Sequence, residues 1–201
     1  MRYHVIGSGD PVIFWGTMFR RENQLEEMTE MLQNLGCTVV LFEADDWNRD
    51  FSPWQYSEFA GEARETLKTL ENTILSQFGD RTKVIAGYSL AGLFALWAAH
   101  ESNAISGCIC CSGSLWYEGW MDYAKEHNLK EDMKVYLSLG GKEKNTKNPV
   151  MAKVEDITKW QSELLKEKGI ASTFVLNPGG HFKDTDKRVI QGIEWMKGQL
   201  K

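Results

Sequence analysis

The sequence has few of the residues that form disulfide or metal frameworks. Its 201 residues include four cysteines and four histidines. Cys108, Cys110 and Cys111 share one apolar run, where adjacent side chains of a strand point to opposite faces and cannot easily pair. We therefore expect buried free thiols, a reducing cytoplasmic environment and no metal site.

Long apolar runs and long basic runs are also missing. No apolar stretch approaches the roughly 18 residues needed to span a bilayer, and residues 1–7 lack the apolar core of a signal peptide. The formal net charge of −5 repels phosphate backbones. The sequence therefore predicts a cytoplasmic protein that neither spans a membrane nor binds nucleic acid, and it leaves a homodimer open.

Short apolar runs alternate with longer helical patterns along the whole chain. The expected strands are roughly Tyr3–Ile6, Pro11–Trp15, Thr38–Glu43, Lys83–Gly87, Gly107–Cys111, Lys134–Leu139 and Ser172–Leu176. The expected helices are Asn23–Leu35, Tyr56–Gln77, Leu90–Glu101, Ala152–Lys168 and Thr185–Gln199. From Thr38 onward the strand runs are continuously apolar or β-branched, which is typical of a parallel sheet covered on both faces. The pattern predicts a single three-layer α/β domain over residues 1–201, with a mostly parallel central sheet and helices on both faces.

A turn of small residues follows the Lys83–Gly87 strand. Ser89 lies at the centre of Gly87-Tyr88-Ser89-Leu90-Ala91-Gly92, with a buried strand before it and an apolar helix after it. A nucleophile elbow needs this arrangement, because a sharp strand-to-helix turn lifts the serine hydroxyl clear of the sheet and leaves space only for small residues two places on either side. Gly87 and Ala91 occupy those places, where the usual pattern has two glycines. The context favours a catalytic serine over a plain turn with a capping serine.

A serine nucleophile needs a base, and in proteins with such an elbow the acid and then the histidine follow the serine. His4 precedes the turn, and His100 lies about 16 Å along the helix that Ser89 opens. His127 stands in a polar stretch typical of a solvated surface. His181 remains, in a glycine-rich loop directly after the last strand, where parallel sheets place their sites. We therefore expect His181 to be the general base.

The acid that orients His181 should lie in the loop after the preceding strand. Glu143 is the first carboxylate after the Lys134–Leu139 strand and is the leading candidate. Asp184, three residues after His181, is the alternative.

Two backbone N–H groups should stabilise the oxyanion that forms when the serine attacks a carbonyl. The first is the N–H of Leu90, at the start of a helix whose positive dipole end faces the site. The second should come from the bend Gly16-Thr17-Met18 after an early central strand, where Thr17 and Met18 are equal candidates.

Three tryptophans end or follow expected strands on the side where these groups would gather. Trp15, Trp47 and Trp116 would line an aromatic pocket above Ser89 and bind substrate there. Ordinary packing at the strand ends is the alternative.

Together these motifs resemble an esterase family of the α/β-hydrolase superfamily, which includes esterase D-like enzymes and enterobactin (siderophore) esterases. The matching segments, in the family's order, are Ala86–Phe94, Cys111–Trp116, Gly140–Glu143 and Gly179–Phe182. The resemblance implies the α/β-hydrolase fold, a Ser-Glu-His triad, no metal and no organic cofactor. The chain departs from the family at Ala91, in using Glu rather than the more usual Asp, and in its short segment before Gly87, which leaves the substrate class open.

We expect a compact serine esterase without a large lid, which cleaves a small carboxylic ester through an acyl-enzyme intermediate. A peptidase or an acyltransferase is an alternative with the same triad, because pocket shape selects the acceptor. A non-catalytic binding protein of the same fold is a further alternative. The presence of serine, carboxylate and histidine in the required order argues against it.

Overall fold

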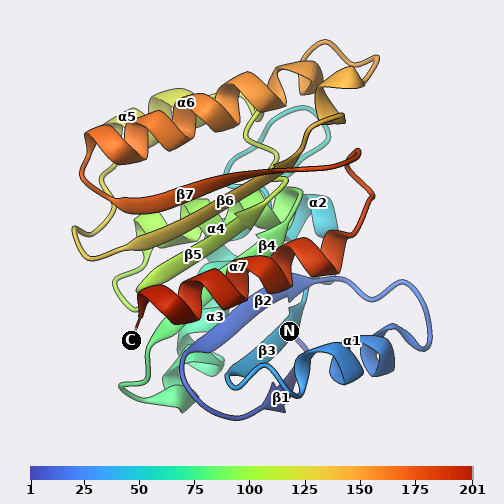
Figure 1. Ribbon diagram of the computed structural model, residues 1–201, viewed down its shortest axis with the longest axis vertical. Helices are drawn as coiled ribbons and strands as arrows, with labels where there is room; N and C mark the ends of the chain where they lie inside the picture. The colour runs from blue at the N-terminus through green and yellow to red at the C-terminus, as the bar shows by residue number, and fades with distance from the viewer. Residues whose placement is uncertain (201) are drawn as a thin grey trace.

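The computed structural model describes residues 1–200 and contains one sheet of seven strands (Figure 1). The strands are β1 (Tyr3–Gly7), β2 (Val12–Thr17), β3 (Thr38–Glu43), β4 (Lys83–Tyr88), β5 (Gly107–Cys111), β6 (Lys134–Gly140) and β7 (Ala171–Asn177). Their order in the sheet is β1-β3-β2-β4-β5-β6-β7. β1 runs antiparallel to β3, and the other neighbouring pairs are parallel. The prediction of a mostly parallel sheet is confirmed.

Helices cover both faces of this sheet and complete a three-layer α/β architecture (Figure 1). The helices are α1 (Gln24–Leu32), α2 (Trp47–Asp50), α3 (Ala63–Thr73), α4 (Leu90–Glu101), α5 (Trp120–Glu126), α6 (Val154–Glu167) and α7 (Thr185–Gln199). Short 3₁₀ turns are η1 (Leu75–Phe78), η2 (Glu143–Asn145) and η3 (Met151–Lys153). The core on one face lies under α1 and α7, and the core on the other lies under α3, α4, α5 and α6.

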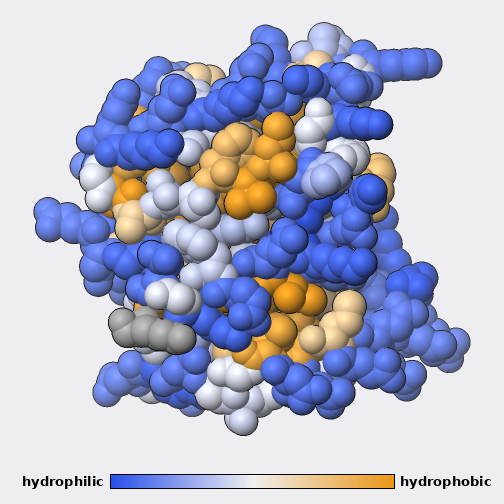
Figure 2. Space-filling view, in the orientation of Figure 1, coloured by the Kyte–Doolittle hydropathy of each residue, from blue (hydrophilic) through white to orange (hydrophobic). Residues whose placement is uncertain are grey.

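Burial follows from this layering. β2 and β3 are buried along their whole length, because helices cover the sheet on both sides. All four cysteines are buried and free, as the sequence predicts. In the face of Figure 2, which carries α1 and α7, most of the surface is hydrophilic and apolar side chains gather over β7 and between α7 and α1. Within residues 1–200, no helix is long and apolar enough to cross a membrane.

Several predicted boundaries are wrong. The helix expected over Tyr56–Gln77 begins only at Ala63, because Tyr56 and Phe59 instead pair with each other and pack their rings on Tyr117. Gly61, with a φ of +83°, completes that turn, since a Cβ there would lie 2.2 Å from the Trp54 carbonyl carbon.

Other elements were missed or misplaced. β2 continues through Gly16 and Thr17, so the bend expected over Gly16–Met18 starts later. The short helices α2 and α5 were not predicted. Asp46 caps α2 by accepting hydrogen bonds from two backbone N–H groups of the first turn.

The strand order reverses between β2 and β4. The chain leaves β2 for β3 on one side and then crosses to β4 on the other, with Gly16 paired beside Gly87. In open parallel sheets the carboxyl ends of the strands at such a switch point border a crevice. The residues after β2 and β4 therefore lie at the place where this topology favours a site.

The turn from β4 into α4 leaves no space for a side chain at Gly87. A Cβ there would lie 2.0 Å from the Ala91 carbonyl oxygen and 2.2 Å from its carbonyl carbon, and both are backbone atoms that cannot swing away. The glycine requirement thus falls on Gly87, whereas Ala91 fits fully buried at the place where the usual pattern has a second glycine.

Gly87→Ala should lower the free energy of unfolding by about 1–3 kcal/mol, because the added methyl forces the turn apart. Gly198→Ala is the matched control, since no atom lies within 4 Å of a Cβ there and α7 continues through it. Urea unfolding of both variants tests this. Equal stability of the two variants would contradict the geometry of the turn.

Candidate active site

Ser89 occupies a strained backbone conformation at the top of the β4–α4 turn. Its φ and ψ are 59° and −123°, outside the ordinary regions for a residue with a side chain. Four hydrogen bonds hold it there. Ser89 N–H donates to the Cys111 carbonyl (3.0 Å), and the Ser89 carbonyl accepts from the N–H groups of Gly92, Leu93 and Ser114 (3.0, 3.1 and 3.1 Å). The end of β5 thus fixes the elbow as firmly as α4 does.

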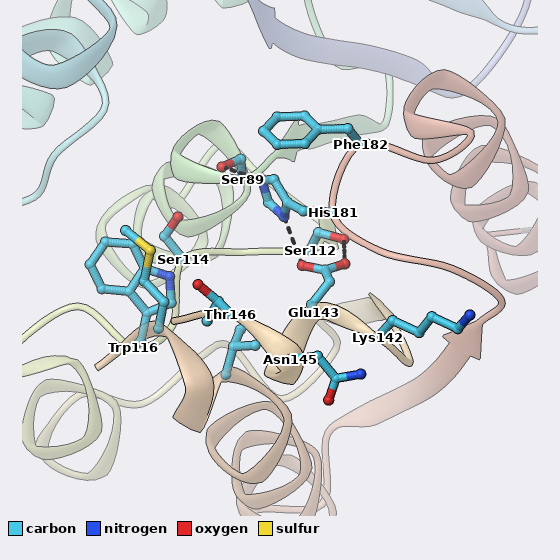
Figure 3. Close-up of a pocket in the computed structure, with 12 residues that line it drawn as sticks. Ser89, Ser112, Ser114, Trp116, Lys142, Glu143, Asn145, Thr146, His181 and Phe182 are labelled. Atoms are coloured by element: carbon cyan, nitrogen blue, oxygen red, sulfur yellow. Dashed lines mark hydrogen bonds and ion pairs between the residues drawn. The ribbon is translucent and has the colours of Figure 1, made fainter. Parts of the chain in front are cut away.

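His181 lies between Ser89 and Glu143 (Figure 3). Its Nε2 is 3.0 Å from Ser89 Oγ, and its Nδ1 is 2.7 Å from Glu143 Oε2. The loops after β4, β6 and β7 supply these three residues, so side chains far apart in the sequence meet at one edge of the sheet. The structure therefore brings together the three residues that the sequence names as nucleophile, base and acid.

The Glu143 carboxylate is buried and fully hydrogen bonded. Its Oε1 accepts from Ser112 Oγ and from the Gly140 N–H, both at 2.6 Å. Burial by itself raises the pKa of this carboxyl, but the hydrogen bonds from His181, Ser112 and Gly140 outweigh it and bring the pKa below its ordinary value. Glu143 is consequently a carboxylate at neutral pH, as an anion that orients a histidine has to be.

Arg188, on α7, extends this network to the end of β4 and to the loops after β5, β6 and β7. Its side chain is 2% exposed, and its Nη1 lies 3.1 Å from Glu143 Oε1. The same nitrogen donates to Tyr88 Oη at 3.0 Å and to Ser112 Oγ at 3.1 Å, while Nη2 donates to the Gly180 carbonyl at 3.0 Å. One guanidinium therefore connects the acid, the elbow and the loop that carries the histidine.

The histidine loop is fixed through its backbone as well. Tyr88 Oη donates to the His181 carbonyl at 2.5 Å, and Lys142 N–H donates to the Gly179 carbonyl at 3.0 Å. Gly140 lies where these groups converge, and a Cβ there would be 2.7 Å from the Gly179 carbonyl oxygen. These hydrogen bonds fix the backbone of the loop and thereby help to orient the His181 ring.

Sequence reasoning missed the roles of Arg188, Ser112 and Tyr88. The available signal for Arg188 was its position on the buried face of the last helix, with Val189 and Ile193. A cation on an apolar face needs a buried partner. Nothing in the local sequence says that this partner is Glu143.

Two cavities meet at Ser89. One, of about 470 Å³, is lined by Ser89, His181, Trp116 and residues of the Glu143 loop (Figure 3). The other, of about 510 Å³, lies toward the ends of β2 and α2. Phe182 lines both and is 90% exposed, with its ring edge-on to that of His181. A molecule bound at Ser89 can therefore extend in two directions.

The predicted tryptophans divide between these cavities. Trp116 lines the first, and Trp15 and Trp47 line the second. Packing accounts for part of their contacts too, since Trp15 is nearly buried and Trp47 lies edge-on to Phe51.

The candidate oxyanion donors also lie near Ser89. Leu90 is the first residue of α4, and the first N–H groups of a helix have no partner within it. Thr17 and Met18 line the second cavity together with Ser89. Thr17 is the last residue of β2, whereas Met18 lies just outside the strand.

The remaining candidates lie away from the site. Asp184 is exposed, pairs with Lys187 at 3.4 Å and makes no hydrogen bond to His181. His4 is 3.3 Å from Glu43 on the edge of the sheet, and His127 stacks on Tyr123. His100 is packed among aromatic rings, where burial lowers its pKa to about 4.

Arg188→Met should lower the free energy of unfolding by about 3–5 kcal/mol, because it leaves the buried Glu143 carboxylate without its cation. Arg188→Lys should recover only part of this loss, since a single ammonium cannot span the positions of Nη1 and Nη2. Lys187→Met removes the neighbouring, exposed cation and should cost less than about 0.5 kcal/mol. Denaturant unfolding of the three variants measures this, and similar losses for Arg188→Met and Lys187→Met would refute the role of the buried pair.

Comparison with known proteins finds relatives in sequence and in fold. A Bacillus subtilis (strain 168) protein named YbbA, described as uncharacterized, is 25% identical over 98% of this chain and 89% of its own. An IroE-like serine hydrolase from Shewanella oneidensis superposes with a TM-score of 0.74 at 16% identity, covering 96% of this chain and 74% of the other. The enterobactin esterase FES from Shigella flexneri, solved in the presence of enterobactin, gives a TM-score of 0.70 at 18% identity over 99% of this chain and 55% of its own.

These structures share the α/β-hydrolase fold with this chain. A sequence model of the family described as Putative esterase matches residues 2–184. The chain therefore belongs to the Putative esterase family and is a carboxylic ester hydrolase of the α/β-hydrolase fold.

Proposed function

We propose that this enzyme cleaves a small carboxylic ester through an acyl-enzyme intermediate, with Ser89, His181 and Glu143 as its catalytic triad. The observation that supports this most is the continuous hydrogen-bonded chain from Ser89 Oγ through both ring nitrogens of His181 to Glu143. That chain opens onto two cavities at its serine end. A serine hydroxyl becomes an effective nucleophile only when an adjacent base removes its proton.

In the first half of the reaction His181 Nε2 takes the Ser89 Oγ proton while Oγ bonds to the ester carbonyl carbon. Glu143, ionised and beside Nδ1, selects the tautomer with a free Nε2 and stabilises the imidazolium that forms. The Leu90 N–H and an N–H at the end of β2 stabilise the negative charge on the former carbonyl oxygen. Of Thr17 and Met18 we favour Met18, because its N–H lies outside the strand ladder.

Collapse of this intermediate breaks the bond to the alcohol oxygen, and His181 Nε2 returns its proton to that oxygen. The acyl group stays on Ser89 Oγ until a water, deprotonated by His181, attacks it. Release of the carboxylic acid restores the serine. A peptidase or acyltransferase would use the same steps with another leaving group or acceptor, and a hydrogen-bonded triad of this kind weighs against a purely non-catalytic binding role.

Ser89→Ala should abolish covalent labelling by a fluorophosphonate probe and hydrolysis of p-nitrophenyl acetate. Ser114→Ala is the matched control, since Ser114 lines the same cavity but, within residues 1–200, its hydroxyl makes no hydrogen bond to His181. It should label as the wild type does. In-gel fluorescence and peptide mapping measure both. Labelling of Ser89→Ala at the wild-type level would rule out Ser89 as the nucleophile.

Glu143→Gln should lower kcat by about 10⁴-fold, because the amide no longer stabilises the imidazolium and favours the wrong tautomer. Asp184→Asn should leave kcat within about twofold of wild type, since that carboxylate is exposed and paired with Lys187. Steady-state kinetics on p-nitrophenyl acetate compare the two variants. A large loss in Asp184→Asn with near-normal Glu143→Gln would transfer the role of the acid to Asp184.

A further inference from the structure

A third and larger cavity lies next to the site without reaching Ser89. Its volume is about 720 Å³, and Trp116 lines both this cavity and the one over Ser89. We call it the distal cavity. In Figure 3, Trp116 and Lys142 lie on opposite sides of Ser112 and Glu143, and the indole belongs to the lining of the Ser89 cavity.

The same two segments border both cavities. One is the loop after β5, in which Ser114 faces the Ser89 cavity and the adjacent Leu115 faces the distal one. The other is the turn over residues 150–154, in which Met151 and Val154 face the Ser89 cavity, and Val150 and Lys153 face the distal one. The two cavities therefore share Trp116, and the turn over residues 150–154 borders both.

Trp116 is suited to face a ligand. Its side chain is only partly buried, and its ring meets those of Phe59 and Tyr117 at centroid distances of 6.3 and 6.4 Å. Within residues 1–200 its indole N–H makes no hydrogen bond, unlike that of Trp120, which donates to Gln161. An apolar chain that extends from the Ser89 cavity toward the distal one would meet this ring.

The distal cavity has an apolar floor and a charged rim. The floor contains Leu115, Tyr117 and Met121. The charged residues at the rim are all exposed and of both signs: Glu118, Asp122, Lys125, Lys153 and Asp156. Because the rim carries charges of both signs, it prefers neither anions nor cations. The floor favours a neutral apolar group.

We propose that the distal cavity binds the far end of a long apolar limb of the ester, which passes Trp116 on its way from Ser89. This rests on the proposed function, because it requires that the ester carbonyl be held at Ser89, and it extends the substrates from small esters to esters with one long apolar limb. Each methylene moved from water into such a cavity strengthens binding about fourfold. A short ester does not reach beyond Trp116, so its hydrolysis should be independent of the distal cavity.

Met121→Arg is the test variant, because Met121 lines the distal cavity and not the one over Ser89. The substrates are p-nitrophenyl esters from acetate to decanoate, and acetate esters of alcohols from ethanol to decanol. We expect kcat/KM for the longest ester of one series to fall at least about tenfold, because the arginine side chain prevents several methylene groups of the ester from binding in the cavity. The value for p-nitrophenyl acetate should change less than about twofold. The series that responds identifies the limb as acyl or alcohol.

Met31→Arg is the matched control, since Met31 is an exposed methionine of α1 that lines none of the three cavities. It should leave both length profiles unchanged. Val150→Arg, also at the distal cavity but on an exposed turn, replaces Met121→Arg if that variant does not fold.

Two outcomes overturn the proposal: length profiles identical to wild type in both series, or an equal loss on acetate and on the longest ester. If the wild type does not hydrolyse p-nitrophenyl acetate at all, the proposed function fails instead, so the two failures are distinguishable.

Discussion

A buried ion pair between Glu143 and Arg188 holds together parts of the chain that no local interaction would join. The carboxylate sits at the end of β6 and the guanidinium on α7, and both are almost fully removed from water. Removing two charges from water is costly unless further hydrogen bonds satisfy them. Ser112 and the Gly140 N–H meet that need on the acid. Tyr88 and the Gly180 carbonyl meet it at both Nη atoms of the arginine, whereas its Nε has no partner within residues 1–200. Each of these partners borders the proposed reaction centre, so satisfying the charges also fixes the geometry of the site.

The order of the strands in the sheet makes this network reachable. β4, β5, β6 and β7 lie side by side and parallel, so the loops after them emerge in sequence along one edge. The elbow, Ser112, Glu143 and His181 each follow one of these strands. A strained serine conformation persists only where surrounding bonds outweigh its cost, and here the bonds come from the neighbouring β5 end as well as from α4. The preorganisation of the site is therefore a property of the whole sheet.

Whether a feature depends on local or on long-range contacts determines whether it could be predicted from the sequence. The elbow could be recognised because its motif, Gly87–Gly92, spans only six residues and a sharp turn limits the size of the side chains within it. His181 was readable because there are only four histidines, and Glu143 because topology places the acid one strand before the histidine. The role of Arg188 could not be predicted, because its partner lies on a different element and helical periodicity shows only that a cation faces inward. The helix start near Tyr56 failed for a similar reason, because contacts with Tyr117, distant in sequence, override the local helical pattern.

The exposed ring of Phe182 follows from the same network. Its loop is held by Arg188 at the Gly180 carbonyl, by Tyr88 at the His181 carbonyl and by Lys142 N–H at the Gly179 carbonyl, so the backbone presents the ring from a fixed position. A ligand that covers a side chain already in place loses little loop entropy on binding. Because Phe182 stands between the two cavities that meet at Ser89, it can contact both limbs of a bound ester at the point where they diverge. Fixed walls of this kind can discriminate between substrates without any movement of the loop.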